Sequence, residues 1–89
     1  MKIRLELFGA SREFSNKDHL EFNIKEKISI KDFRKKIINY VNVNFKGNEN
    51  FKKIVETSAF CSEDNNIIND NYKITKDQKI AIIPPIGGG

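Results

Sequence analysis

The chain has 89 residues, a mass of 10.3 kDa, 38% hydrophobic residues and a formal net charge of +4. This length suffices for one helix layer on one sheet and excludes two domains or a deep catalytic cavity. A single cysteine, Cys61, excludes an internal disulfide framework, and a single histidine, His19, argues against a histidine-based metal site or triad.

Neither a membrane span nor a targeting segment is predicted. No apolar run approaches the roughly 18 residues that a bilayer crossing needs, and the N-terminus lacks the pattern of a signal peptide. We therefore expect a cytoplasmic protein with no metal, no bound cofactor and no membrane partner. The positive charge is regional, because residues 24–53 hold nine basic and three acidic residues, a net +6.

Two segments alternate between apolar and polar residues with the period of half-buried strands. Their apolar positions are Ile3, Leu5 and Leu7 in residues 2–8, and Leu20, Phe22 and Ile24 in residues 19–24. Residues 9–18 are polar and turn-rich. The two segments are therefore predicted to form an antiparallel pair joined by a fairly long loop.

A helix is predicted from Ser29 to about Asn44. Ser29 is the expected N-cap, and Asp32 stands three residues later, as in a variant of the capping box. Apolar residues then recur at helical spacing at Ile30, Phe33, Ile37, Tyr40 and Val41. The following region is mixed: residues 53–55 fit either a last helical turn or a loop, and residues 57–61 fit a strand.

The last predicted strand, residues 79–83, is an almost continuous apolar run of the kind found in strands buried on both faces. Pro84 and Pro85 end it. The order of elements predicts an α+β domain, the β-grasp or ubiquitin-like roll. We expect a mixed sheet of four to five strands, with the first and last strands at its centre and one main helix on one face. The predicted core consists of Ile3, Leu5, Leu7, Leu20, Phe22, Phe33, Ile37, Val41, Ile80 and Ile82.

The C-terminal end is the part of the sequence that carries chemistry. We expect a domain over residues 1–85 and a flexible glycine tail over residues 86–89. From Pro84 to Gly89 the chain can reach roughly 20 Å, at about 3.3 Å per residue. Glycines have no side chains, so the tail could enter a narrow tunnel and present the Gly89 carboxylate to a partner's active site. The segment predicted to enter the partner is Pro84, Pro85, Ile86, Gly87 and Gly88.

This end, I-A-I-I-P-P-I-G-G-G, resembles the C-terminus of the MoaD/ThiS family of ubiquitin-like sulfur carriers. It looks most like the small subunit of molybdopterin synthase. The segment L-F-G-A-S-R-E-F, residues 7–14, is similar to the first strand and following loop of that family. The helix start S-I-K-D-F-R-K-K-I is also similar. The sequence departs from the family at T-K-D-Q-K, residues 75–79, where an acid-glycine-acid turn is usual.

The resemblance implies that an ATP-dependent activating enzyme adenylates the Gly89 carboxylate and that a sulfur donor protein converts it to a thiocarboxylate. A larger synthase subunit would then take the tail, and sulfur would pass to the pterin precursor of molybdopterin. The chain itself would supply no general acid or base and would bind no cofactor, because ATP is used by the activating enzyme.

Two aromatic residues flank the loop that contains Arg12. Phe8 and Phe14 could cover one end of the core or anchor a partner. We take them as the hypothesis for a partner-docking surface. Cys61 is interpreted as a small hydrophobic residue in the core or at an edge.

Other function classes remain open. The same tail could serve a protein modifier joined to lysines through Gly89, or a carrier for thiamin or tRNA thiolation. A nucleic-acid-binding module would use the basic helix residues Lys31, Arg34, Lys35 and Lys36. That module lacks interleaved aromatics and leaves the tail unexplained, so these residues are interpreted as a solvated face and no nucleic-acid partner is expected.

Overall fold

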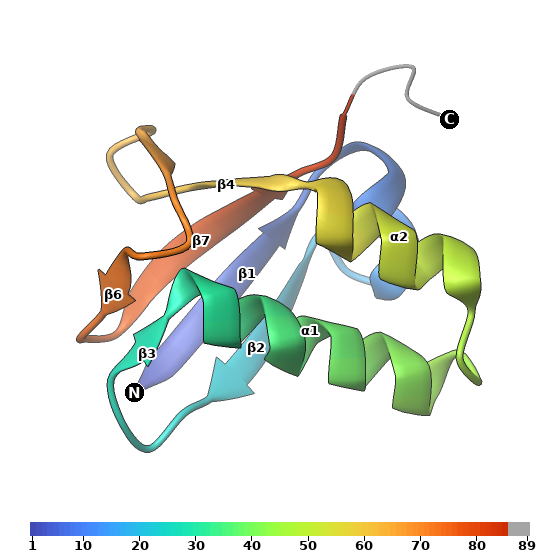
Figure 1. Cartoon of the computed structure of the whole chain (residues 1–89), viewed down its shortest axis with the longest axis horizontal. Coiled ribbons are helices and arrows are strands. Elements are labelled where there is room, and N and C mark those ends of the chain that lie inside the picture. Colours follow the sequence, from blue (N-terminus) through green and yellow to red (C-terminus); the bar gives the residue numbers. More distant parts are fainter. Residues whose placement is uncertain (86–89) are drawn as a thin grey trace.

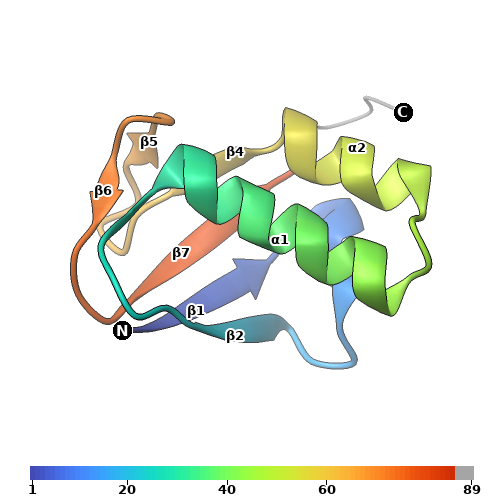
Figure 2. The same cartoon turned by 60° about the horizontal axis from the view of Figure 1, so that its bottom comes forward.

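The computed structural model describes residues 1–85. Within this range five strands form one mixed sheet, and two helices cover one of its faces (Figures 1 and 2). The strands are β1 (Lys2–Leu7), β2 (His19–Asn23), β3 (Ile28–Ser29), β4 (Ala59–Cys61), β5 (Ile67–Ile68), β6 (Lys73–Ile74) and β7 (Gln78–Ile83). The helices are α1 (Ile30–Asn44), α2 (Glu49–Thr57) and the short 3-10 helix η1 (Gly9–Phe14).

The strand order in the sheet is β2-β1-β7-β4-β5, and β3 pairs with β6 in a separate ribbon. β1 and β7 run parallel, with Leu7 opposite Ile82, while every other pair is antiparallel. The predicted position of the first and last strands is confirmed, since β7 is the middle strand and β1 lies beside it. In the part of the chain that is described, no helix is long and apolar enough to cross a bilayer.

The core lies between the sheet and α1 and matches the prediction closely. Eight of the ten predicted core residues are at most 2% exposed. The other two, Leu20 and Phe22, are half-buried and pack against the core from β2. They keep some exposure because β2 is an edge strand with a neighbour on one side only.

Helix α1 begins as predicted. The Ser29 hydroxyl accepts a hydrogen bond from the Asp32 N–H at 3.1 Å, which satisfies one of the free amides of the first turn. After Asn44 the chain reverses through Lys46 and Gly47, both at positive φ. Gly47 at φ +70° adopts a left-handed conformation that glycine takes without strain.

The sequence predicted one main helix and did not predict the second helix, α2. It is capped by the Asn48 side chain, which accepts a hydrogen bond from the Phe51 N–H at 3.1 Å. Phe51, Ile54 and Val55 turn toward α1 and η1, and Val55 is fully buried. Nine residues are too few to hold a helix in water, so this packing is what stabilises α2.

Arg34 is not part of a solvated basic face, which corrects the interpretation of that helix surface. Its guanidinium donates to the carbonyl oxygens of Val55 and Ser58, both at 2.8 Å, and pairs with the Asp70 carboxylate at 3.0 Å. It also lies 4.7 Å from the centre of the Phe60 ring. Arg34 therefore binds the free carbonyls at the end of α2 and ties α1, α2 and β4 together.

Candidate functional site

The root of the C-terminal tail lies at the edge of the sheet where β1 and β7 both end. Pro84 follows β7 and packs beside Gly9, the first residue of η1; a Cβ added to Gly9 would lie 3.8 Å from the Pro84 Cδ. Gly9 itself is at φ +55°, where other residues are strained. On its other side β7 pairs with β4 through Ile83 and Ala59, so the chain leaves the domain between η1 and the start of β4 (Figure 1).

Ser11 holds the backbone of Phe8 at this edge. The fully buried Ser11 hydroxyl donates to the Phe8 carbonyl at 2.6 Å and accepts from the Phe8 N–H at 3.0 Å. Phe8 continues the extended conformation of β1, with φ −130° and ψ 154°. Since Leu7 points into the core, the alternation directs Phe8 to the opposite face of the sheet, where it is 47% exposed.

Within residues 1–85 no helix covers that opposite face, and one half of the face is apolar. Side chains on alternate positions of β7, β4 and β5 point to it, next to Phe8. We call this group the apolar patch: Phe8, Ala59, Cys61, Ile67, Ala81 and Ile83. Ile67 is 77% exposed and Ile83 is 36% exposed. The patch reaches the tail root, because Ile83 immediately precedes Pro84.

The other half of the open face is charged. On β1 and β2 the Arg4 guanidinium lies 3.5 Å from the Glu6 carboxylate, and the Lys2 ammonium lies 3.7 Å from that of Glu21. The ring of His19 hydrogen-bonds to the Asp18 carboxylate at 3.0 Å. This hydrogen bond holds the pKa of Asp18 below its ordinary value, with a smaller contribution from the charge of the imidazole. The charged strands therefore border the apolar patch on the side of β1.

The expectation that the last strand is buried on both faces is wrong. Ile80 and Ile82 are fully buried, but Ala81 and Ile83 point to the open face. Both helices lie on the same side of the sheet, so no other element of the described chain forms a layer over the second face of β7 (Figure 2). The apolar run of this strand thus supplies the core on one side and the apolar patch on the other.

The placement of Phe14 in a docking surface is also wrong. Phe14 is fully buried, with its ring 5.1 Å from that of Phe51. Its carbonyl oxygen accepts a hydrogen bond from the Tyr40 hydroxyl at 3.0 Å. The turn of η1 points Phe14 inward beneath α2, whereas Phe8, before that turn, stays on the surface as expected.

The remaining predicted site residues are only partly within the described chain. Pro84 is half-buried against Gly9, and Pro85 is exposed. Ile86, Gly87, Gly88 and Gly89 lie outside the described residues, so their expected roles are untested. Sequence reasoning missed Ser11, Ala81 and Ile83 as parts of this site. The last two could have been found by applying to β7 the same alternation of inward and outward side chains that was applied to β1.

No protein-family model matches the chain, and no curated protein sequence matches it. Its similarity to solved structures is extensive. The crystal structure of SAMP1 from Haloferax volcanii superposes over 100% of both chains with a TM-score of 0.69 and 11% sequence identity. The chain has the β-grasp fold.

A second structure agrees, from a Pyrococcus furiosus protein described as a candidate molybdopterin converting factor, subunit 1. It covers 96% of this chain and 98% of its own, with a TM-score of 0.65 and 16% identity. The predicted α+β, ubiquitin-like architecture is therefore confirmed. At these identities the similarity concerns the fold alone, and the function of this β-grasp domain has to be argued from its own residues.

Proposed function

We propose that this β-grasp protein is a sulfur carrier for molybdopterin biosynthesis that acts through the carboxylate of Gly89. The observation that carries the proposal is the position of the tail root beside the apolar patch. A protein that binds this patch is placed next to Pro84, from which the glycine tail extends. The partner would then recognise the rigid sheet face, while the chemistry would take place on the glycine tail, which has no side chains.

The chemistry resides in the partner proteins. The Gly89 carboxylate would attack the α-phosphorus of ATP on an activating enzyme, releasing pyrophosphate and forming an acyl-adenylate. A sulfur donor at the oxidation level of sulfide would displace AMP and leave a thiocarboxylate. A larger synthase subunit would transfer this sulfur to the pterin precursor, and water would regenerate the carboxylate. The P. furiosus neighbour, described as a subunit of a molybdopterin converting factor, supports this pathway over other sulfur acceptors.

The apolar patch supports a protein partner. Phe8, Ile67 and Ile83 expose large apolar side chains on one uncovered sheet face, and such surfaces mark sites of protein association. The charged half beside it would form a polar rim. We expect the activating enzyme and the larger subunit to bind this same face, since both must receive the same tail.

The decisive experiment is intact mass spectrometry of the protein purified from its own cells. A mass increase equal to the difference between one sulfur and one oxygen atom, confined to the C-terminal peptide, identifies the thiocarboxylate. ATP–pyrophosphate exchange with the cognate activating enzyme should be abolished by deletion of Gly89, with no change in melting temperature. Full exchange activity in that deletion would refute the carrier, and isopeptide adducts on other proteins without thiocarboxylate would indicate a modifier instead.

A further inference from the structure

A second surface, separate from the tail root and the apolar patch, lies along the outer edge of β2. Within residues 1–85, no strand pairs with that side of β2. Asp18 accepts a hydrogen bond from the Leu7 N–H, and Ile24 both donates to and accepts from Met1. By the alternation of an antiparallel pair, the even-numbered residues of β2 face β1. The N–H and C=O groups of His19, Glu21 and Asn23 consequently point outward, as an open strand edge.

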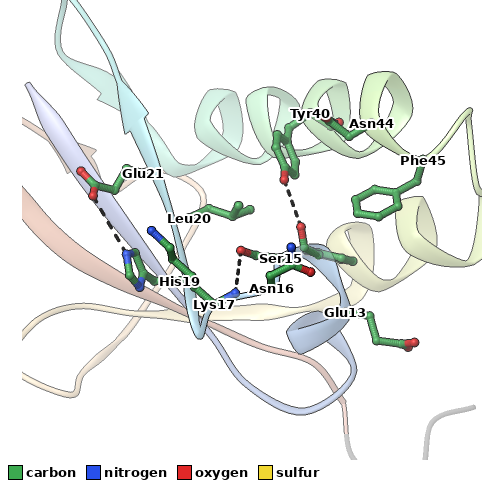
Figure 3. A pocket seen from close by; sticks show the side chains of 11 residues that line it. Glu13, Ser15, Asn16, Lys17, His19, Leu20, Glu21, Tyr40, Asn44 and Phe45 are labelled. Carbon is green, nitrogen blue, oxygen red and sulfur yellow. Dashed lines mark hydrogen bonds and ion pairs between the residues drawn. The ribbon is translucent and has the colours of Figure 1, made fainter.

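A groove of about 580 Å³ runs beside this edge, between β2 and the C-terminal half of α1 (Figure 3). Leu20, Tyr40 and Phe45 provide its apolar side chains. The Tyr40 ring lies 6.0 Å from that of Phe22 on the next inward-facing position of β2. An added strand would therefore place every second side chain on apolar surface between β2 and α1.

The charges around the edge favour one kind of segment. Lys17 lines the groove, Lys36 is one helical turn before Tyr40 on the same side of α1, and Lys25 and Lys27 follow the end of β2. In the described chain none of these four lysines takes part in an ion pair. Within the same residues, three acidic side chains nearby also make no ion pair: Glu13, Glu26 and Asp77, which lines a small pocket together with Asn23 and Lys25. Four lysines against three carboxylates leave positive charge in excess. Glu21 is engaged on the open face by Lys2.

We infer that the edge of β2 binds an extended peptide segment of another protein, with apolar residues at alternate positions and acidic residues flanking them. The peptide backbone would exchange hydrogen bonds with His19, Glu21 and Asn23. Its apolar side chains would lie on Leu20, Tyr40 and Phe45, and its carboxylates would be near the four lysines. This surface does not include the tail root at Pro84, so a partner bound there would leave the root uncovered.

The test uses the full-length protein and a synthetic peptide with a Val-Ile-Val-Ile core flanked by aspartates. In ¹⁵N–¹H spectra we expect the peptide to shift the amides of His19, Glu21 and Asn23 and to slow their exchange with solvent. Lys17→Glu and Lys36→Glu should each weaken binding about three- to tenfold, because charge reversal replaces attraction by repulsion. The matched control is Lys76→Glu, an exposed lysine in the turn before β7 with the same change in net charge.

The backbone interaction has its own variant. Glu21→Pro removes an outward N–H without removing a hydrogen bond to β1, and proline is tolerated on edge strands. We expect it to weaken peptide binding several-fold relative to Glu21→Ala, which keeps the N–H. If Glu21→Pro unfolds the protein, the lysine variants still decide the question.

Several outcomes would overturn the inference. These are the absence of amide shifts in β2 at millimolar peptide, shifts centred on Phe8 and Ile83, or equal losses of affinity in Lys76→Glu and Lys17→Glu. Concentration-dependent shifts of β2 without peptide would show that a second copy of the chain pairs there. A single-stranded oligonucleotide that shifts these amides when the peptide does not would assign the lysines to nucleic acid.

Discussion

The buried hydroxyl of Ser11 makes two hydrogen bonds to the backbone of Phe8, one as donor and one as acceptor. Phe8 is the largest side chain of the apolar patch, and Gly9 next to it packs on Pro84. One hydroxyl therefore orders the point where the patch and the tail root meet.

Ser11→Ala is expected to lower the free energy of unfolding by about 1 kcal/mol, because it leaves the Phe8 N–H without its partner, while the Phe8 carbonyl keeps the hydrogen bond from the Ser11 N–H at 3.2 Å. Chemical denaturation would measure this loss. Ser15→Ala is the control, since the Ser15 hydroxyl binds only an exposed amide, that of Lys17. An equal loss in both variants would contradict the role assigned to Ser11.

Phe8→Ala should separate binding from stability. The side chain is 47% exposed and outside the core, so the melting temperature should change little. If Phe8 anchors the partner, its truncation should weaken binding to the activating enzyme by tenfold or more, about 1.4 kcal/mol or above. Titration calorimetry would measure the affinity. Val43→Ala, at a residue 71% exposed on α1, is the control, and an equal effect there would remove Phe8 from the docking surface.

Gly9→Ala and Gly47→Ala form a matched pair. Both glycines have positive φ, +55° and +70°, so alanine should cost about 1–2 kcal/mol at each position. Only Gly9 contacts Pro84, whereas a Cβ at Gly47 would have nothing within 4 Å. We expect Gly9→Ala alone to shift the NMR signals of Pro84 and to slow ATP–pyrophosphate exchange. A similar decrease of exchange in Gly47→Ala would mean that lost stability explains both effects.

Arg34→Lys keeps the charge but removes the planar fork that binds two carbonyls and a carboxylate. It should cost about 1–3 kcal/mol of unfolding free energy, measured by denaturation. Lys35→Ala, on the exposed side of α1 with a 3.8 Å pair to Asp32, should change stability by less than about 0.5 kcal/mol. Hydrogen exchange in α2 should accelerate in Arg34→Lys only. Unchanged exchange there would show that Arg34 does not hold the end of α2.

The lowered pKa of Asp18 gives a pH dependence with a defined sign. A carboxyl with a pKa depressed by folding stabilises the native state above the ordinary aspartate pKa, and this stabilisation is lost as pH falls through the lowered value. Wild type should therefore be more stable than Asp18→Asn at neutral pH, and the difference should vanish in strong acid. His19→Gln should return the pKa of Asp18, followed by NMR titration, toward the ordinary value, because the His19 hydrogen bond is its main cause. A titration unaffected by His19→Gln would contradict this assignment.

Most of the fold could be predicted from the sequence because its signals are local. Alternation in β1 and β2 assigns Ile3, Leu5 and Leu7 to one side, and the spacing after Ser29 assigns Phe33 and Ile37 to the buried side of α1. These assignments follow from the periods of strand and helix, which do not depend on the rest of the chain. The chemistry expected of Gly89 also comes from the sequence and remains a prediction.

Tertiary packing decided the features that the strand and helix periods do not determine. Helix α2 is too short to be stable by itself, and only its contacts with α1 and η1 hold it. Phe14 and Arg34 look like surface residues, yet Phe14 is buried against Phe51 and Arg34 binds the carbonyls of another helix. The sequence of β7 is apolar on both sides, but its exposure depends on how many faces of the sheet the helices cover. Because both helices pack on one face, Ala81 and Ile83 remain on the surface beside the tail.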